Sequence, residues 1–102
     1  NMTTIATKMK LANYSTHIVG KWDIGYATET HLPSGRGFDT SMVYLNAAND
    51  YFTEESALLC NNTPLVDFWG NGQPLYGKNG TGYEEFLFEE EIHQLIDSFT
   101  AD

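Results

Sequence analysis

The first twenty residues set the strongest limit on what this chain can fold into. Three apolar residues of Thr3–Ala12 recur at spacings of four and three: Ile5, Met9 and Ala12. This spacing puts them on one face of a short helix. Asn13 follows, and asparagine tolerates the left-handed backbone that ends many helices. Ser15–Val19 is β-branched and apolar, which predicts a buried strand running into Gly20. A helix, a tight turn and a buried strand indicate an α/β fold.

The middle of the chain predicts a loop and a second extended segment. Thr28–Gly37 contains one proline and two glycines among few apolar residues, so we expect a loop there. Phe38–Leu45 is expected to be extended. Its predicted core residues are Met42 or Val43, Tyr44 and Leu45. Asn46–Cys60 is ambiguous, and we expect a short helix near Glu54–Leu59.

A hairpin is predicted in the C-terminal half. Gly70-Asn71-Gly72 lies between the apolar runs Val66–Trp69 and Gln73–Tyr76. Asn-Gly between apolar runs is a strong hairpin signal. Pro74 lacks an N–H to donate, so we expect its strand at an edge of the sheet.

The last predicted element is a helix. Thr81-Gly82-Tyr83-Glu84 matches a capping box, in which the first and fourth side chains bond each other's backbone N–H groups. A single apolar stripe follows, made of Phe88, Ile92, Leu95, Ile96 and Phe99. We expect this stripe to bury against another surface.

The composition excludes several classes of partner. The chain has 102 residues, enough for one small domain. Its formal charge of −9, without any Lys/Arg cluster, argues against nucleic acid and against anionic membrane surfaces. No apolar run approaches the ~20 residues that a membrane span needs. Cys60 is the one cysteine and cannot form an internal disulfide.

Lys21 lies where the predicted strand gives way to a loop. In open parallel sheets, ligand sites gather at the carboxyl ends of strands, so this lysine is placed to face a cleft. The preceding glycine, Gly20, allows a close approach of the backbone. An ammonium is a compact charge with three donors, which suits a tetrahedral anion such as sulfate.

The sequence around Lys21 resembles a known family. Asn13–Gly25 reads NYSTHIVGKWDIG, and Gly35–Asp39 reads GRGFD. Together they resemble the second signature of the sulfatase family, G-Y-x-T-x-x-V-G-K-W-H-L-G, and that family's downstream R-G-F-D. The likeness runs from Leu11 to Tyr51, where Asn49-Asp50-Tyr51 is similar to the S-E-D-Y of arylsulfatase-B-like enzymes.

This resemblance implies an alkaline-phosphatase-like α/β fold. Residues 1–102 would be part of a sulfatase N-terminal-type catalytic domain, with no internal boundary, in an enzyme that hydrolyses aryl or carbohydrate sulfate esters. The family's nucleophile is a formylglycine made from a C/S-x-P-x-R motif, and calcium polarises the sulfate oxygens. Neither that motif nor the family's calcium ligands has a counterpart here. We therefore expect the nucleophile and the metal ligands outside this chain, and the chain alone to be inactive.

The resemblance also implies the site residues. The family lysine that matches Lys21 neutralises charge on the sulfate in the transition state. The family histidine two residues later is Asp23 here, which can accept a proton but cannot donate one as an imidazolium. Asp23 can also pair with Lys21 and weaken its positive charge. We predict Lys21 and Asp23 as catalytic residues, and Lys21 and His31 as substrate-binding residues.

Two alternatives stay open beside the enzyme. The first is a catalytically inactive, sulfatase-derived structural or binding subunit of a larger assembly. The second is an unrelated acidic α/β domain that matches by chance. In the sulfatase interpretation, the partners are the remainder of the parent polypeptide or other subunits, together with a sulfated small molecule or glycan.

The other candidate residues have structural interpretations that we favour. The histidines share no metal-ligand spacing: we expect His17 in packing and His93 in solvent. Arg36 is expected to fix its loop through a hydrogen bond to a carboxylate, with substrate contact as the alternative. Trp22 and Trp69 are expected in the core, with a sugar-stacking surface as the alternative.

Four N-x-S/T sequons indicate passage through the secretory route. We predict glycosylation at Asn1, Asn61 and Asn79. Asn13 begins the fourth sequon, but it lies at a tight turn where a sugar fits poorly. The predicted location is therefore lysosomal or extracellular.

Overall fold

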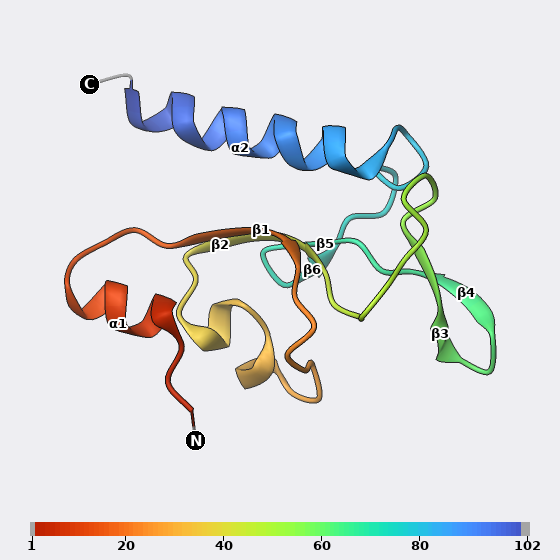
Figure 1. Ribbon diagram of the computed structural model, residues 1–102, viewed down its shortest axis with the longest axis horizontal. Coiled ribbons are helices and arrows are strands. Elements are labelled where there is room, and N and C mark those ends of the chain that lie inside the picture. Colours follow the sequence, from red (N-terminus) through yellow and green to blue (C-terminus); the bar gives the residue numbers. More distant parts are fainter. Residues whose placement is uncertain (1, 101–102) are drawn as a thin grey trace.

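The structure is a computed structural model that describes residues 2–100, apart from the side chains of Leu58, Leu59, Cys60 and Thr100. Its elements, in chain order, are α1 (Ile5–Leu11), β1 (His17–Lys21), the 3₁₀ turns η1 (Glu29–His31) and η2 (Ser34–Arg36), β2 (Thr40–Tyr44), β3 (Glu55–Cys60), β4 (Thr63–Val66), β5 (Trp69–Gly70), β6 (Gln73–Pro74) and α2 (Glu84–Thr100) (Figure 1).

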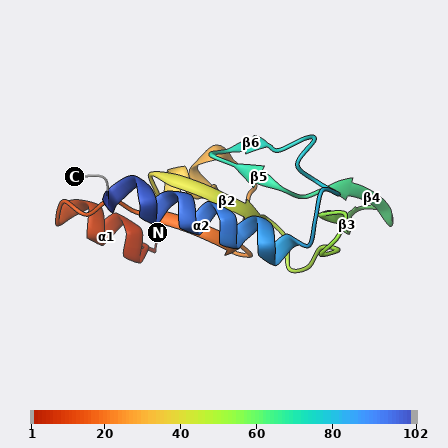
Figure 2. The same cartoon turned by 90° about the horizontal axis from the view of Figure 1, so that it is seen from above.

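The main sheet has the strand order β1-β2-β5-β6. β1 and β2 are parallel, with His17 opposite Thr40 and Lys21 opposite Tyr44. β5 and β6 extend the sheet in antiparallel fashion, and β3 pairs with β4 in a separate hairpin. α2 lies along one side of the sheet, and α1 with the 3₁₀ turns lies on the other (Figure 1). The molecule is flat, with extents of 42 × 36 × 17 Å (Figure 2).

α1 forms where a helix is predicted, but the predicted apolar face is wrong, because Ile5 is 76% exposed and the buried residue of the helix is Ala6. Thr4 is its N-cap, and the Thr4 hydroxyl accepts a hydrogen bond from the backbone N–H of Thr7 at 3.2 Å. After the helix, Asn13 has φ = 62°, the left-handed conformation expected of it. The helix is thus confirmed, and it begins two residues later and ends one residue earlier than the predicted Thr3–Ala12.

β2 divides the core between its two faces. Met42 and Tyr44 are buried on one face, where they pack with Phe68 and Phe88. The second cluster combines Val43, Leu45 and Trp22. Burial on both faces is typical of strands in parallel sheets. The predicted extended segment and its core residues are therefore confirmed.

The predicted hairpin is also confirmed, although its strands are short. Trp69 lies opposite Pro74, and Gly70 lies opposite Gln73. Asn71 and Gly72 both have positive φ, 51° and 79°, as a two-residue hairpin turn requires. Pro74 belongs to β6, the edge strand, so its missing N–H costs no hydrogen bond within the sheet.

The short helix predicted near Glu54–Leu59 is wrong. This segment forms β3, which pairs antiparallel with β4. Asn61 and Asn62 join the two strands with φ of 49° and 61°. Adjacent asparagines with positive φ make the same kind of turn as Asn-Gly, and this turn forces the chain back on itself.

The capping box predicted at the start of α2 is wrong as well. The helix begins at Glu84, and the Thr81 hydroxyl donates instead to the Lys78 carbonyl at 2.6 Å. The Glu84 carboxylate accepts a hydrogen bond from Asn49 Nδ2 at 2.6 Å rather than reaching back to Thr81. A tertiary contact therefore replaces the local one.

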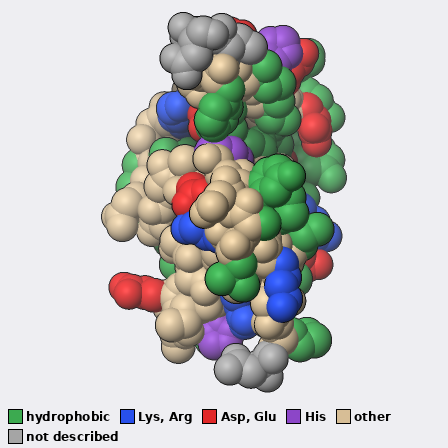
Figure 3. Space-filling model, turned by 90° about the vertical axis from the view of Figure 1, so that its left-hand side faces the viewer, with side chains coloured by type: hydrophobic (Ala, Val, Ile, Leu, Met, Phe, Trp, Pro, Cys, Tyr) green, Lys and Arg blue, Asp and Glu red, His purple; other side chains and the backbone are tan. Residues whose placement is uncertain are grey.

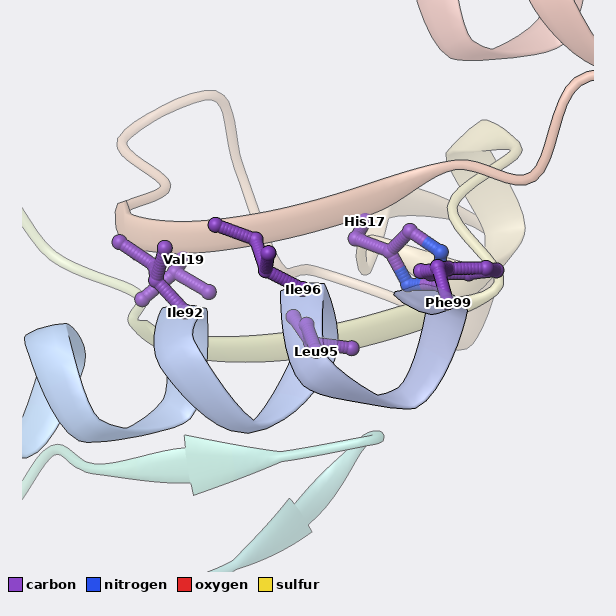
Figure 4. Close-up of a pocket in the computed structure, with 6 residues that line it drawn as sticks. All are labelled: His17, Val19, Ile92, Leu95, Ile96 and Phe99. Atoms are coloured by element: carbon purple, nitrogen blue, oxygen red, sulfur yellow. The ribbon is translucent and has the colours of Figure 1, made fainter. Parts of the chain in front are cut away.

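The apolar stripe of α2 is only partly covered. Phe88 is 6% exposed, whereas Ile92, Ile96 and Phe99 are 42%, 55% and 60% exposed. The last half of the helix faces β1 across a groove lined by His17 and Val19 (Figure 4). Among the described residues, no helix is both long and apolar enough to cross a membrane.

Candidate functional site

Lys21 is the last residue of β1 and lies opposite Tyr44, the last residue of β2. Because the two strands are parallel, their carboxyl ends share one edge of the sheet. The pairing continues past the strand ends: the Trp22 N–H donates to the Tyr44 carbonyl at 2.9 Å, and the Asp23 N–H donates to the Leu45 carbonyl at 3.2 Å. Lys21 and Asp23 are therefore held at the place where open parallel sheets bind ligands.

Lys21 and Asp23 form an ion pair, as we predicted. Lys21 Nζ lies 3.5 Å from Asp23 Oδ2, and the two side chains are 43% and 50% exposed. Exposed pairs of this kind contribute about 1 kcal/mol or less. An anion with two or three acceptor oxygens can therefore compete with Asp23 for the ammonium.

Gly20 sets the backbone direction that leads into Lys21. Its φ is 119°, a conformation that strains any residue with a side chain. A Cβ built at this position would meet no atom within 4 Å, so the requirement for glycine comes from backbone conformation and not from crowding. Asp23 also has positive φ, 49°, which turns the chain away from the sheet.

Trp22 fixes the loop that follows the site. It is 5% exposed, and its indole N–H donates to the carbonyls of Gly25 at 2.8 Å and His31 at 3.1 Å. Its ring meets Phe38 edge-on at 6.0 Å. Trp22 is thus a core residue, as expected, and cannot serve as a sugar-stacking platform. Trp69 is half-buried and packs against the same cluster.

Asp67 supports the end of β2 and was not identified from the sequence. It is 1% exposed, and its carboxylate accepts four hydrogen bonds of 2.9–3.0 Å. The donors are the backbone N–H of Leu45, the backbone N–H and side-chain amide of Asn46, and the indole of Trp69. An acidic residue inside the apolar run Val66–Trp69 was the available signal.

The three histidines occupy separate places. His17 Nδ1 lies 2.7 Å from the Thr40 hydroxyl, and its ring contacts Phe99 at 5.5 Å, so His17 belongs to packing as predicted. His31 Nδ1 lies 2.8 Å from the Thr28 hydroxyl, and His31 lines a cavity of 520 Å³. His93 is exposed beside Glu89 at 3.9 Å.

The two predicted substrate-binding residues, Lys21 and His31, make no direct polar contact in the described part of the chain. Between the described side chains of His31 and Lys21, no hydrogen bond or ion pair is present. Ile24 also lines the cavity that His31 lines, whereas Lys21 and Asp23 are not among its described lining residues.

The expected bond between Arg36 and a carboxylate is wrong. Within residues 2–100, the only partner of the Arg36 side chain is the Met2 carbonyl, 3.4 Å from Nη1. Asp39, the nearest candidate in sequence, pairs with Lys10 at 2.7 Å and accepts from Thr16 N–H at 2.9 Å. Lys10 and Thr16 hold the pKa of Asp39 down at about 2.

Two buried glutamates form a polar cluster beneath the start of α2. Glu54 and Glu84 are both fully buried. Burial raises the pKa of Glu84 to about 7, against the opposing effect of the Asn49 hydrogen bond, and the charge of Glu54 raises it further. Burial also raises the pKa of Glu54, whose carboxylate accepts from Gly80 N–H at 2.6 Å. Sequence reasoning assigned Glu84 only to the capping box.

The sequence and the fold of this chain are each similar to those of known proteins. No protein-family model matches the chain. Its fold is similar to the crystal structure of Ps i-CgsB, with a TM-score of 0.75 and 24% identity over 94% of this chain and 23% of that one. Its sequence is 29% identical over 96 residues to Arylsulfatase J of Mus musculus.

The chain is sulfatase-like. A second structure, Ps i-CgsB in complex with k-i-k-neocarrahexaose, matches 98% of this chain with a TM-score of 0.76 and 22% identity. The match to Arylsulfatase J spans 91% of this chain but 15% of that protein, and the second structure is covered to 24%. The sulfatase-like chain thus spans a small part of the relatives that it matches.

The acidic residues of this sulfatase-like chain do not assemble a metal site of their own. In the part of the chain that the structure describes, no group of three or more His, Cys, Asp or Glu side chains is arranged to hold a metal ion. Asp50 instead accepts from the backbone N–H groups of Phe52 and Thr53, each at 2.9 Å. Among the described residues, no acidic cluster is therefore arranged for a calcium ion.

The predicted glycosylation sites differ in their surroundings. Asn61 is exposed at the turn between β3 and β4. Asn79 is half-buried, and its Oδ1 accepts from Gly77 N–H at 3.2 Å. Asn1 and the side chain of Cys60 lie outside the described residues.

Proposed function

We propose that this chain is part of a sulfuric ester hydrolase with an alkaline-phosphatase-like fold, in which Lys21 contacts the sulfate group. Residues 1–102 would form part of the N-terminal-type catalytic domain, without an internal boundary. The observation that carries the proposal is the position of Lys21 at the carboxyl ends of two parallel strands, in a chain whose sequence is similar to Arylsulfatase J.

Lys21 and Asp23 would have distinct roles. The Lys21 ammonium would donate to a sulfate oxygen and neutralise the charge that grows there in the transition state. Asp23 would accept a proton as a base, because a carboxylate cannot supply one at neutral pH. Their mutual ion pair is weak in solvent, so sulfate binding would separate them and free the carboxylate.

The proposed substrate is an aryl sulfate or a sulfated glycan. Support comes from the similar fold of Ps i-CgsB, whose structure was solved with k-i-k-neocarrahexaose. The proposed partner is the remainder of a parent sulfatase polypeptide or another subunit. It would supply the formylglycine, whose C/S-x-P-x-R motif this sequence lacks, and the calcium ligands, for which the described residues form no cluster. The chain by itself would not turn over sulfate esters.

A secretory destination, lysosomal or extracellular, completes the proposal. It rests on the predicted sequons and on the sulfatase-like sequence. Asn61 would be the most accessible acceptor, because it is exposed at a turn. Asn79 would be a less accessible acceptor, because it is half-buried and held by the Gly77 N–H at its Oδ1.

One observation favours the second candidate, an inactive sulfatase-derived structural or binding subunit. Asp23 occupies the place of the family histidine, and it holds the Lys21 ammonium in an ion pair. In an inactive subunit, this pair would serve only to close the end of β1. Sulfate would then leave Lys21 unchanged.

A sulfate titration of the chain tests the proposed contact between Lys21 and sulfate. We expect the ¹⁵N-detected Nζ signal of Lys21 to shift saturably with sodium sulfate and not with sodium chloride. Lys21→Ala should remove this binding, and Asp23→Asn should strengthen it. Lys78→Ala is the matched control, because Lys78 is an exposed lysine on another loop. A Lys21 signal that ignores sulfate would contradict the proposed contact.

Turnover then decides the role of the contact. In the natural polypeptide that carries this segment, Lys21→Ala should lower kcat for 4-nitrophenyl sulfate by about 10²–10³-fold, as removal of one transition-state donor does. Asp23→Asn removes the proposed proton acceptor and should also lower kcat. Unchanged rates in both variants would remove this pair from the mechanism, and no turnover by the intact polypeptide would favour the inactive subunit.

A further inference from the structure

Two adjoining cavities lie between the N-terminal segment and the loop after the site. The larger has a volume of 520 Å³ and the smaller 250 Å³. The residues that line both are Met2, Thr3, Thr4 and Arg36. Ile24 and His31 complete the larger cavity, and a volume of 520 Å³ is in the range that small-molecule sites occupy.

These cavities differ in charge from the rest of the surface. The chain carries a formal charge of −9, yet no aspartate or glutamate is among the described residues that line either cavity. Their polar groups are the guanidinium of Arg36, the imidazole of His31 and threonine hydroxyls. In contrast, two other surface cavities are lined by Glu90 together with further acidic residues. Figure 3 shows basic and His side chains together beside the N-terminal segment.

Arg36 has unused hydrogen-bond donors. A guanidinium offers five N–H groups in a planar fork. In the described part of the chain, one of them makes a long bond of 3.4 Å to the Met2 carbonyl. Nε is buried and has no partner there. Asp39 cannot serve, because it is engaged by Lys10 and Thr16. Nε itself is closed to solvent, but Arg36 lines both cavities, so an acceptor from outside would be bound by the remaining N–H groups of the guanidinium.

The backbone around Arg36 is fixed in advance. Its carbonyl accepts from the hydroxyls of Thr4 and, at 3.2 Å, Thr7, which ties η2 to the start of α1. Gly37 has φ = 97°, and a Cβ there would lie 2.7 Å from the Thr7 nitrogen, so only glycine permits this approach. His31 is fixed as well, because its carbonyl accepts a hydrogen bond from the Trp22 indole N–H.

We propose that the larger cavity binds a sulfate group of a sugar, with the Arg36 guanidinium as its main donor. The Thr3 hydroxyl and the His31 imidazole would donate to the remaining oxygens or to the sugar hydroxyls. The sugar part of this proposal rests on the proposed function, whereas oxyanion binding by Arg36 does not. Ile24, which lines this cavity, belongs to the loop that leaves the Lys21 site, so a substrate that reached both places would need two sulfate groups.

The test is a titration of the ¹⁵N-labelled chain with glucose 6-sulfate, with unsulfated glucose and sodium chloride as controls. We expect the Arg36 Nε–H signal to shift saturably with glucose 6-sulfate alone. Arg36→Gln should raise the Kd of that perturbation, followed at Ile24 and His31 amides, by about tenfold or more, the usual loss for a charge-assisted contact. Lys8→Gln removes the same charge from an exposed position on α1 and should change Kd less than about twofold.

Each outcome decides between the two proposals. If Lys21→Ala leaves the Arg36 shift intact and sulfate does not perturb Lys21, the proposed function fails and this subsite stands. If glucose 6-sulfate does not shift the Arg36 Nε–H signal of the wild-type chain, the proposed subsite is overturned. This measurement requires no variant. Equal shifts with glucose and glucose 6-sulfate also overturn it. Should Arg36→Gln unfold, Arg36→Lys, which keeps the charge but loses the fork, should bind more weakly than wild type.

Discussion

The two halves of α2 make different contacts with the rest of the molecule. At its beginning, Glu84 is fully buried and Phe88 is 6% exposed against Phe68 and Tyr44. At its end, Ile96 and Phe99 are more than half exposed, although both lie over β1 (Figure 4). One amphipathic stripe thus has a complete core at one end and an incomplete one at the other.

The difference follows from what lies beneath each half. The first half covers the centre of the sheet, where β2 contributes Met42 and Tyr44. The second half covers β1, the edge strand, beyond which the described sheet does not continue. An apolar helix face needs a surface at least as wide as itself. We infer that the start of α2 contributes most of the stability that the helix gives to the fold, and that its exposed apolar end can bind other apolar surfaces.

The largest expected effect is therefore at Phe88. Phe88→Ala should lower the free energy of unfolding by about 3–5 kcal/mol, because it leaves a cavity in a closed cluster. Phe99→Ala makes the same change at a 60% exposed position and should cost less than about 1 kcal/mol. Urea unfolding followed by circular dichroism measures both. Equal losses would mean that the two halves do not differ.

The second prediction concerns Glu84 and pH. Its pKa is raised from 4.5 to about 7, so the folded chain binds the proton more tightly than the unfolded chain does. The free energy of unfolding should therefore fall as pH rises from about 4.5 to about 7. Glu84→Gln should reduce this slope and raise the melting temperature at pH 8. Glu90→Gln, at an exposed position of the same helix, is the control and should keep the slope.

The third prediction concerns the exposed half of the stripe. The wild-type chain should bind a hydrophobic dye and self-associate as its concentration rises. Ile96→Lys should reduce dye fluorescence several-fold with little loss of stability. Sedimentation velocity provides the second measurement. A monodisperse wild-type chain without dye binding would show that the groove between α2 and β1 is closed in solution. It would favour a chain that folds on its own, as the inactive-subunit candidate requires.

The smallest effect is expected at Asp39, on the far side of the sheet. Lys10 and Thr16 lower its pKa from 3.8 to about 2. Its contribution to stability is present above pH 4 and is lost as pH falls toward 2. Asp39→Asn should lower the melting temperature at pH 5 by a few degrees and leave it nearly unchanged at pH 2. A variant with the wild-type melting temperature at pH 5 would show that the pair with Lys10 contributes nothing.

Local signals in the sequence predicted the elements that depend on local chemistry. Asn13 ends α1, Asn71-Gly72 turns the hairpin, and Pro74 lies on an edge strand. The turn at Asn61-Asn62 carries the same type of signal, and reading it would have converted the predicted helix near Glu54–Leu59 into a strand. That error came from composition, since a short apolar run fits either element.

Residues whose roles depend on distant partners could not be predicted in the same way. Glu84 bonds Asn49, thirty-five positions away, instead of capping its own helix. Asp67 and Arg36 are likewise defined by segments far along the chain. The position of Lys21 at a strand end was predictable because the apolar run before it ends there, whereas the cavity beside Arg36 arises only when the N-terminal segment packs on η2.

The open side of β1 has a consequence for how such a molecule meets other polypeptides. Its outward backbone groups offer a ready template to any extended segment of matching length. The strand residues, His17, Ile18, Val19, Gly20 and Lys21, include no proline, and Lys21 at the end is the one charged side chain that would oppose such pairing. Recruitment by strand addition would leave the hydrogen bonds between β1 and β2 in place, so Lys21 would stay in position while a wider sheet grew beside it.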